Sequence, residues 1–302
     1  MKNISVFAAV IIAFSWIVGA LWAADRNADS IGTHGMGSYC RIVSLAPSVT
    51  ETLFALGLGD RVVGVTRYCR FPPEALTKAK VGGYYDPNYE EIVRLRPDLV
   101  IMLAEHEAPK KHLQSLQLAT LAVSHGKIAE IIQSITIIGE RCGAGGKAGE
   151  IVADINRRIE KIKTRTRGLP RPRVLVSVGH GMGSSSDLCV AGRNTYYEEI
   201  LLLAGGVNAI ENKTVPFPLV SAEGIYQINP QVIIDLLPET GEKGRNRETI
   251  LAEWNKISAV DAVRNKRVYL VAQDHAFIPG PRFIALLEAI ALALHPEELR
   301  GN

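Results

Sequence analysis

A short stretch occurs twice in the chain, as EEIVRLRPDLVI at residues 90–101 and as EGIYQINPQVII at residues 223–234. Shifting the numbering by 133 superposes the acidic residue that opens each copy, Glu90 on Glu223, and also the proline within it. Each copy is typical of a short helix that stops near a proline and is followed by a buried strand. The repetition predicts that the two halves of the chain contain the same supersecondary unit.

The residues around each copy alternate between short apolar runs and segments with helical spacing. In the first half, buried strands are expected at 41–45, 61–65, 99–103 and 119–123. A helix is expected at 110–117, and a strand at 173–178 opens the second half. Strands that alternate with helices at this spacing form βαβ units, in which neighbouring strands run parallel. The pattern therefore predicts an α/β fold with mostly parallel sheets.

Between the two halves, apolar residues recur at the spacing of an amphipathic helix. They are Ala148, Ile151, Val152, Ile155, Ile159 and Ile162. The helix that they predict has about 22 residues, is about 33 Å long and ends before the breaker GLPRP at 168–172. We therefore expect an N-terminal α/β lobe at 41–143, a connecting helix at 144–168 and a C-terminal α/β lobe at 169–302.

Composition and charge narrow the class of protein. A chain of 302 residues with 47% hydrophobic residues can bury the cores of two domains. Its formal charge of +3, from 34 basic and 31 acidic residues, argues against nucleic-acid binding, which needs a dense basic surface.

The chain lacks common catalytic motifs. It contains no GxSxG turn for a nucleophilic serine and no HExxH metal motif. The glycine-rich run GHGMGS at 179–184 leads into no helical segment, so it suits the edge of a binding cleft better than a phosphate-binding loop. Glu105-His106-Glu107 follows the strand at 99–103 and is interpreted as a solvated loop, with a place at the cleft as the alternative. A protein that is not an enzyme and has no metal site of its own is expected, and an enzyme using the same cleft is the rival interpretation.

The first residues are typical of an export signal. Lys2 is followed by an almost wholly apolar run at 4–22, and polar residues begin at Asp25. We interpret residues 1–24 as a signal peptide and 25–40 as a flexible leader, which places the protein in the periplasm. The alternative is an uncleaved anchor helix, because the run is nearly long enough to span a bilayer. No cysteine follows the run closely, so a lipid anchor is not expected.

An exported protein meets an oxidising environment, in which cysteines can pair. The candidates are Cys40, Cys69, Cys142 and Cys189. They allow three pairings, and buried free thiols are the alternative, so the sequence leaves the disulfide state open.

Several stretches, in order along the chain, carry a resemblance to a known family. They are RIVSLAPSVTETLFALGLGDRVVGVT at 41–66, YCRFPPEA at 68–75, VGGYYDPNYEEIVRLRPDLVI at 81–101 and VPFPLVSAEGIYQINPQVII at 215–234. From about residue 40 to the C-terminus the chain resembles the substrate-binding proteins of ABC importers for cobalamin, haem and ferric siderophores, and it is most similar to the cobalamin-binding members. The resemblance implies two Rossmann-like α/β lobes with mostly parallel sheets, one long rigid helix that joins them, and a ligand held between the lobes.

The resemblance also assigns a role to the glutamate at the start of each repeated stretch. In the family, one glutamate on each lobe docks onto arginines of the membrane permease, and Glu90 and Glu223 stand at those positions. Two carboxylates on separate lobes can match both the charge and the spacing of a partner. The alternative is local, because an acid in the first turn of a helix suits the helix dipole. The expected partners are the permease with its ATPase and a large metal chelate, without nucleic acid, and a monomer is expected.

The resemblance places the ligand against aromatic side chains in loops, because flat apolar rings suit a large planar chelate. The ligand-binding candidates are Tyr68, Tyr84, Tyr85, Phe217, Asp274, Phe277 and Arg282. Arg67 and Arg70, beside Tyr68, add more positive charge than a corrin needs, which leaves room for an anionic ligand such as haem or a ferric siderophore. The ligand carries its own cobalt or iron, so no cofactor is expected.

Overall fold

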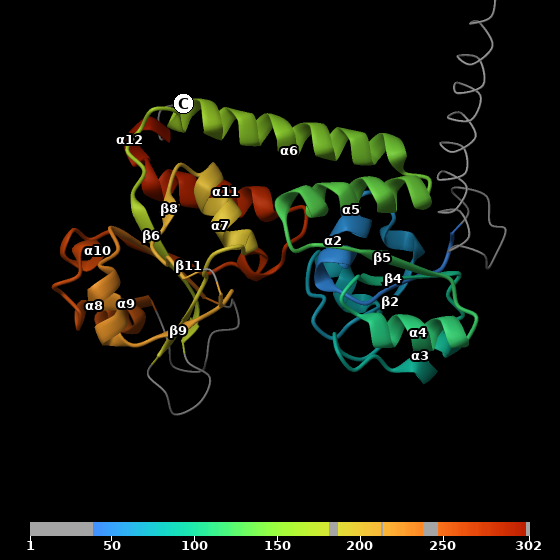
Figure 1. Cartoon of the computed structure of the whole chain (residues 1–302). Coiled ribbons are helices and arrows are strands. Elements are labelled where there is room, and N and C mark those ends of the chain that lie inside the picture. Colours follow the sequence, from blue (N-terminus) through green and yellow to red (C-terminus); the bar gives the residue numbers. More distant parts are fainter. Residues whose placement is uncertain (1–38, 181–186, 213, 238–246, 300–302) are drawn as a thin grey trace, which may run out of the picture. The chain divides into compact units, whose positions relative to one another are not determined.

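The computed structural model describes residues 39–180, 187–212, 214–237 and 247–299 (Figure 1). The predicted signal peptide, most of the predicted leader and most of the glycine-rich run at 179–184 lie outside these residues. No helix within the described ranges is long and apolar enough to cross a membrane.

The first sheet is built from short apolar strands in the order β3-β2-β1-β4-β5. Its strands are β1 (Ile42–Ser44), β2 (Val62–Val65), β3 (Ala79–Lys80), β4 (Leu99–Leu103) and β5 (Thr120–Val123). Neighbouring strands run parallel, as the alternation of strands and helices predicts. The strand β4 is apolar and buried along its whole length, because side chains from helices pack on both of its faces.

The helices of this first lobe have limits that local residues explain. They are α2 (Pro47–Ala55), α3 (Tyr89–Arg94), α4 (Glu107–Ser115) and α5 (Ile128–Arg141). The helix expected at 110–117 is α4, which starts earlier because Pro109 needs no N–H partner in a first turn. It ends earlier than expected because Gln117 adopts a left-handed backbone conformation, with φ of 58°.

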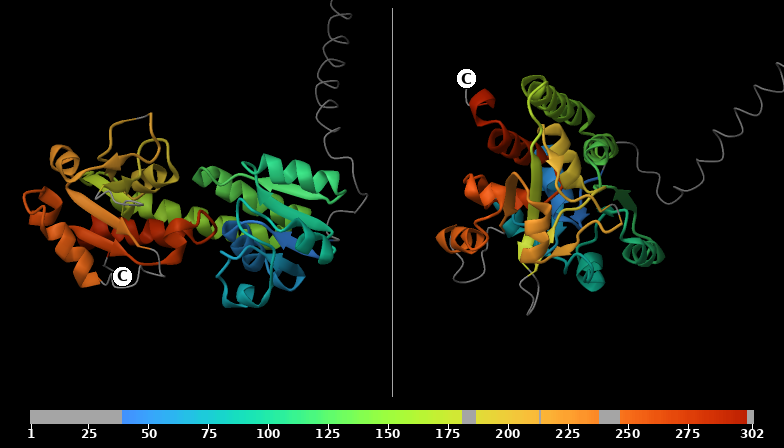
Figure 2. Two further views of the ribbon diagram at one scale, coloured as in Figure 1. Left: turned by 90° about the horizontal axis from the view of Figure 1, so that it is seen from below. Right: turned by 60° about the vertical axis from the view of Figure 1, so that its left-hand side comes forward.

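The second sheet keeps a parallel centre and adds an antiparallel side, in the order β11-β10-β6-β7-β9, with β8 also paired to β6. Its strands are β6 (Arg173–His180), β7 (Leu188–Val190), β8 (Val207–Asn208), β9 (Leu219–Val220), β10 (Val232–Leu236) and β11 (Val268–Val271). The helices of this second lobe are α7 (Tyr196–Leu203), α8 (Ala222–Ile228), α9 (Arg247–Asn255), α10 (Asp261–Arg264), α11 (Phe283–Leu294) and α12 (Pro296–Leu299). Figure 2 shows helices on both sides of this sheet, and apolar side chains fill the space on each face.

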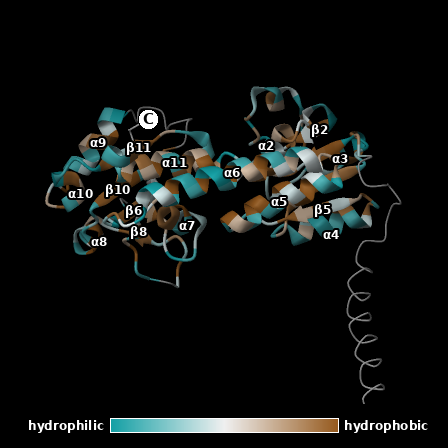
Figure 3. Ribbon diagram, turned by 90° about the horizontal axis from the view of Figure 1, so that it is seen from above, coloured by the Kyte–Doolittle hydropathy of each residue, from teal (hydrophilic) through white to brown (hydrophobic). Residues whose placement is uncertain are grey.

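A long helix, α6 (Gly145–Thr166), connects the first sheet to the second. It has 22 residues, which matches the predicted length. Its apolar face packs on α5 of the first lobe and on α7 and α11 of the second. Figure 3 shows hydrophobic residues interrupting the hydrophilic ones along α6, which is the pattern of an amphipathic helix. The predicted fold class, two α/β lobes with mostly parallel sheets joined by one long helix, is confirmed.

The sequence repeat extends to secondary structure. The shift of 133 residues carries the bounds of β4 onto those of β10, and the start of α3 onto the start of α8. Asn88 caps α3 by accepting a hydrogen bond from the backbone N–H of Glu91 at 3.0 Å. At the equivalent position, Ser221 caps α8 by accepting one from the N–H of Gly224 at 3.3 Å. The two lobes therefore share their helix starts as well as their strands.

In each lobe, an arginine near the start of a central strand donates a hydrogen bond to a backbone carbonyl at the end of the short helix, α3 or α8. In the first lobe, Arg41 donates from Nη2 to the carbonyl oxygen of Leu95 at 2.7 Å. In the second lobe, Arg173 donates from Nη1 to the carbonyl oxygen of Ile228, the residue equivalent to Leu95, at 2.8 Å. The same bond in both lobes shows that the repeat is one of structure and not only of sequence.

Candidate functional site

Ligands of open α/β sheets bind beyond the carboxyl ends of the parallel strands, where the following loops meet. In the first lobe, Tyr68 follows β2, and Tyr84 and Tyr85 follow β3. In the second lobe, Asp274 and Phe277 begin and end a 3-10 turn, η4 (Asp274–Phe277), that comes soon after β11. The fold thus brings these candidates to the carboxyl ends of the two sheets.

Tyr84 and Tyr85 form an aromatic cluster with His106, which follows β4. The ring centroids of Tyr84 and His106 lie 4.2 Å apart and those of Tyr84 and Tyr85 lie 4.7 Å apart, both edge to face. The Tyr84 hydroxyl donates to Glu105 Oε1 at 2.8 Å. Burial, and then this carboxylate, raise the pKa of Tyr84, so it stays a neutral donor. Tyr85 is 82% exposed and presents its ring to solvent.

Tyr68 is exposed in the loop after β2. The Arg67 guanidinium lies 5.1 Å from the centre of the Tyr68 ring and donates from Nη2 to both carboxylate oxygens of Asp86, at 3.0 and 2.9 Å. Asp86 therefore offsets one of the two positive charges beside Tyr68, while Arg70 is exposed. The excess of positive charge here is smaller than the sequence suggests.

Phe217 is exposed in the loop before β9. Because β9 pairs with β7 and β7 pairs with β6, this loop lies at the antiparallel side of the second sheet. Gly192 lets the loop approach closely, because a Cβ at that position would lie 2.7 Å from the carbonyl oxygen of Val215. The Tyr197 ring lies edge-on to Phe217, with the centroids 6.3 Å apart. The loop thus presents an aromatic ring on the second lobe.

Asp274 and Arg282, predicted as ligand contacts, pair with each other and with a buried glutamate of the first lobe. Arg282 donates to the carboxylate of Glu51 at 2.9 and 2.5 Å and to that of Asp274 at 3.0 and 3.1 Å. Glu51 lies in α2, and its side chain is 2% exposed. The guanidinium also lies 3.7 Å from the centre of the Phe71 ring. Glu51, Arg282 and Asp274, called the inter-lobe triad below, join the two lobes.

The charges of the triad depend on one another. Burial raises the pKa of Glu51 more than the hydrogen bond from Arg282 lowers it. Desolvation alone would lower the pKa of Arg282, but its hydrogen bonds to Glu51 and Asp274 outweigh this and raise it. Burial also opposes ionisation of Asp274, yet Arg282 prevails and lowers the pKa of that carboxyl. Arg282 is thus the cation that balances two carboxylates from different lobes.

Sequence reasoning missed Glu51 as a site residue and misjudged His106. No local pattern marks Glu51, because its partner Arg282 is 231 residues away along the chain. The interpretation of residues 105–107 as a solvated loop is wrong for His106, which is 3% exposed because the tyrosine rings cover it. Its position after an apolar parallel strand is the signal for the alternative, a place at the cleft, since such positions face ligands.

A second buried histidine follows β5, the strand next to β4. His125 Nδ1 lies 2.7 Å from Ser48 Oγ, and its Nε2 lies 2.8 Å from Ser134 Oγ. A neutral imidazole has one donor and one acceptor nitrogen, so the two hydroxyls satisfy both. Burial lowers the pKa of His125 from 6.5 to about 4.

We expect the protein to lose stability as the pH falls from about 7 to about 4. In this range His125 takes up a proton in the unfolded chain, where its pKa is ordinary, but stays neutral in the folded chain. Because the unfolded chain binds more protons, a lower pH stabilises it relative to the folded chain. The difference amounts to about 3 kcal/mol of unfolding free energy at the acid end. Urea unfolding at a series of pH values measures it, and the His125→Asn variant should show a smaller change. The same pH dependence in both proteins would contradict this role of His125.

The predicted docking glutamates are exposed in the first turns of their helices, Glu90 in α3 and Glu223 in α8. The neighbouring Glu91 is already engaged, because Arg94 donates to its two carboxylate oxygens at 2.8 and 2.5 Å. Each N-cap described above accepts from one backbone N–H, and hydrogen bonds from its own backbone and from Ser221 lower the pKa of the Glu223 carboxyl. Both glutamates thus stand where a helix dipole favours an acid, and their exposure also leaves them accessible to a partner.

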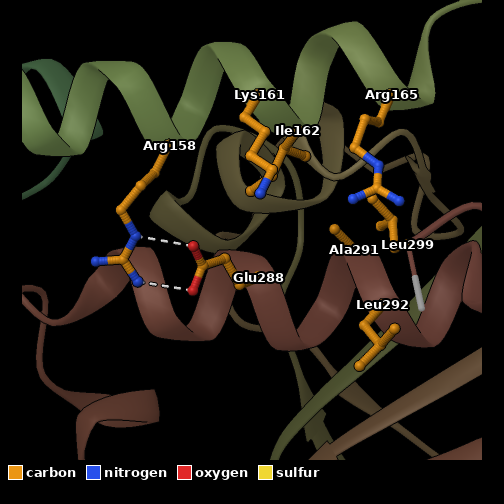
Figure 4. A pocket seen from close by; sticks show the side chains of 8 residues that line it. All are labelled: Arg158, Lys161, Ile162, Arg165, Glu288, Ala291, Leu292 and Leu299. Atoms are coloured by element: carbon orange, nitrogen blue, oxygen red, sulfur yellow. Dashed lines mark hydrogen bonds and ion pairs between the residues drawn. The ribbon is translucent and has the colours of Figure 1, made fainter. Parts of the chain in front are cut away.

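The groove between α6 and α11 is lined by basic and apolar side chains (Figure 4). Arg158 donates to the two carboxylate oxygens of Glu288 across it, at 2.8 and 2.7 Å. Lys161 and Arg165 extend from the same helix. The predicted ligand residues do not line this groove, which is a contact between the connecting helix and the second lobe.

The structure holds Cys40, Cys69, Cys142 and Cys189 as thiols, with no disulfide among them. Burial raises the pKa of Cys142 to about 11 and also raises that of Cys69. Thiols in such surroundings are poor nucleophiles.

Comparison with known proteins identifies the family of the chain. Residues 42–274 match the family model described as periplasmic binding protein. An ABC transporter substrate-binding lipoprotein of Bacillus subtilis, YvrC, is 31% identical over 266 residues, which cover 86% of this chain and 81% of YvrC. The vitamin B12-binding protein of Vibrio cholerae is 29% identical over 259 residues, which cover 84% of this chain and 88% of that protein.

Solved structures show the same architecture. The vitamin B12 binding protein BtuF of Vibrio cholerae superposes with a TM-score of 0.69 at 26% identity, over 87% of this chain and 99% of BtuF. The haem-binding protein RhuT of Roseiflexus superposes with a TM-score of 0.71 at 25% identity, over 87% of this chain and 100% of RhuT. The chain therefore belongs to the periplasmic binding protein family, whose members serve transport and are not enzymes.

Proposed function

We propose that this chain captures a large metal chelate outside the cytoplasm and delivers it to the permease of an ABC importer. The first candidate for the chelate is a corrinoid, cobalamin or cobinamide. The observation that carries the proposal is the presence of exposed aromatic rings on both lobes, at Tyr68 and Tyr85 in the loops after β2 and β3, and at Phe217 in the loop before β9. The vitamin B12-binding and haem-binding relatives support it.

The ligand is held between the lobe at 41–143 and the lobe at 169–302, and the helix at 144–168 limits their relative motion. Flat aromatic faces from both lobes can cover the two sides of one planar ring system. The inter-lobe triad adds a polar connection between the lobes near these loops. Asp274, Phe277 and Arg282 then line the site from the second lobe, with Arg282 shared between the ligand edge and Glu51.

Delivery requires a membrane partner. In this proposal Glu90 and Glu223 dock onto basic side chains of the permease, which works with its ATPase, and the chain acts as a monomer. Because the two glutamates occupy equivalent positions of a structural repeat, they can meet equivalent positions of a partner with two similar halves. The predicted signal peptide at 1–24 exports the chain to the periplasm, and the ligand brings its own cobalt or iron.

An anionic chelate, such as haem or a ferric siderophore, is the second candidate. The observation that favours it is Arg70, which is exposed beside Tyr68 on the first lobe. A carboxylate at the rim of the ligand would pair with this guanidinium. A corrinoid has less need of such a contact.

The two-lobe capture predicts that Tyr84→Ala and Phe217→Ala each weaken ligand binding by about 1–2 kcal/mol, or about 5–30-fold in Kd. Each variant removes an aromatic face from a different lobe, so both should affect the same ligand. Calorimetric titration with cyanocobalamin and with ferric haem measures the change. Tyr226→Ala is the control, because Tyr226 is also an exposed tyrosine but lies on α8. Unchanged affinity in both test variants would place the ligand elsewhere.

A further inference from the structure

His106 lies where β4 ends and α4 begins, behind the rings of Tyr84 and Tyr85. Its ring centroid is 4.2 Å from that of Tyr84 and 5.9 Å from that of Tyr85, and the residue is 3% exposed. Among the residues that the structure describes, neither Nδ1 nor Nε2 of this imidazole has a hydrogen-bond partner. Buried polar groups normally form hydrogen bonds, so two buried ring nitrogens without a partner need an explanation.

The neighbouring His125 shows the usual arrangement. It follows the next strand at the same edge of the sheet, and a serine hydroxyl lies within 2.8 Å of each ring nitrogen. His106 is buried to a similar extent, yet neither of its ring nitrogens has a hydrogen-bond partner among the described residues. Burial lowers the pKa of His106, so the imidazole is neutral and keeps a lone pair that can bind a metal.

The rings of Tyr84 and Tyr85 lie against His106, and they differ in how firmly they are held. Tyr84 is held by its hydrogen bond to Glu105 at 2.8 Å. Tyr85 is 82% exposed, and exposed side chains change rotamer within nanoseconds. A change of the Tyr85 rotamer would uncover the His106 ring nitrogens toward a chelate that lies against these tyrosines.

We propose that His106 is an axial ligand to the cobalt or iron of the bound chelate. The inference rests on the proposed function and narrows it to chelates with an exchangeable axial position. A ring nitrogen donates its lone pair to the metal and a coordinated water leaves, while the oxidation state of the metal and the protonation of the imidazole stay the same. Siderophores that fill every position around iron are not held in this way.

Two forms of one corrinoid test this coordination. Aquocobinamide carries exchangeable water on cobalt, whereas dicyanocobinamide has both axial positions blocked. We expect the full-length exported protein to shift the visible spectrum of aquocobinamide and to bind it at least about 10-fold more tightly than the dicyano form. Ferric haem without and with cyanide is the corresponding pair for an iron chelate.

Two histidine variants provide the comparison. His106→Leu should abolish both the spectral shift and the preference for the exchangeable form. His112→Leu should keep both, because His112 is exposed on α4, the helix that follows His106, and lies against Tyr89, with ring centroids 4.2 Å apart.

The outcomes separate the two proposals. Equal binding of both forms by the wild-type protein, without a spectral shift, would overturn coordination by His106 and leave the proposed function standing. Failure to bind any of the corrinoid or haem probes would overturn the proposed function as well. Because the wild-type spectrum already discriminates, the test does not depend on the folding of the His106→Leu variant.

Discussion

The Arg282→Ala variant is expected to lose about 3–5 kcal/mol of unfolding free energy. Arg282 is the counter-ion of Glu51, whose side chain is 2% exposed, and it donates to that carboxylate at 2.9 and 2.5 Å. Its removal leaves a buried charge without compensation and removes the cation that lies against Phe71. Urea unfolding near neutral pH, followed by circular dichroism, measures the loss.

Arg158 provides a matched control for this variant. It also forms a two-pronged ion pair, with Glu288, but the two side chains are 33% and 44% exposed (Figure 4). Exposed ion pairs contribute little to stability, so Arg158→Ala should lower the free energy of unfolding by at most about 1 kcal/mol. A double variant, Arg282→Ala with Glu51→Gln, should recover part of the loss because no charge stays buried. Equal losses in the two single variants would show that the inter-lobe triad contributes no more than a surface pair.

Reversing both docking charges, with Glu90→Arg and Glu223→Arg in one chain, is expected to abolish uptake and leave ligand affinity unchanged. Both side chains are exposed, so the substitutions should not disturb the fold. They would place like charges against the basic residues proposed for the permease, which costs several kcal/mol at an interface. Uptake of labelled ligand by cells that contain the native importer, together with calorimetric affinity of the purified variant, measures both quantities.

The control for this experiment changes the same charge elsewhere. Glu150 and Glu160 are exposed on α6, where each pairs with a lysine three residues away. Their replacement by arginine should leave uptake intact. If the Glu90 and Glu223 variant loses affinity along with uptake, the glutamates contact the ligand or support the fold. If its uptake is normal, they have no part in docking.

Much of the fold could be predicted because its signals are local. The repeat at 90–101 and 223–234 carries its own helix start, its proline and its buried strand, and these reappear in the structure at matching positions. The spacing of isoleucines likewise marks α6, because a long helix shows its buried face in its sequence.

The site was harder to predict because the type of a side chain does not reveal which residue or ligand it contacts. Asp274 and Arg282 have the same character whether they face a ligand or the other lobe, and only the fold shows that Glu51 meets them. His106 lies in a polar segment that looks solvated, and its burial depends on tyrosines from a distant loop. Such contacts across the chain leave no periodic pattern.

The measurement that bears most directly on the proposed function is a calorimetric titration of the exported wild-type protein. Cyanocobalamin, cobinamide, ferric haem and two ferric siderophores would be tested side by side. We expect saturable one-to-one binding of a corrinoid, and binding of haem or a ferric siderophore alone would keep the transport role while changing the cargo. The absence of binding with every one of these chelates would contradict the claim that this chain is a metal-chelate receptor.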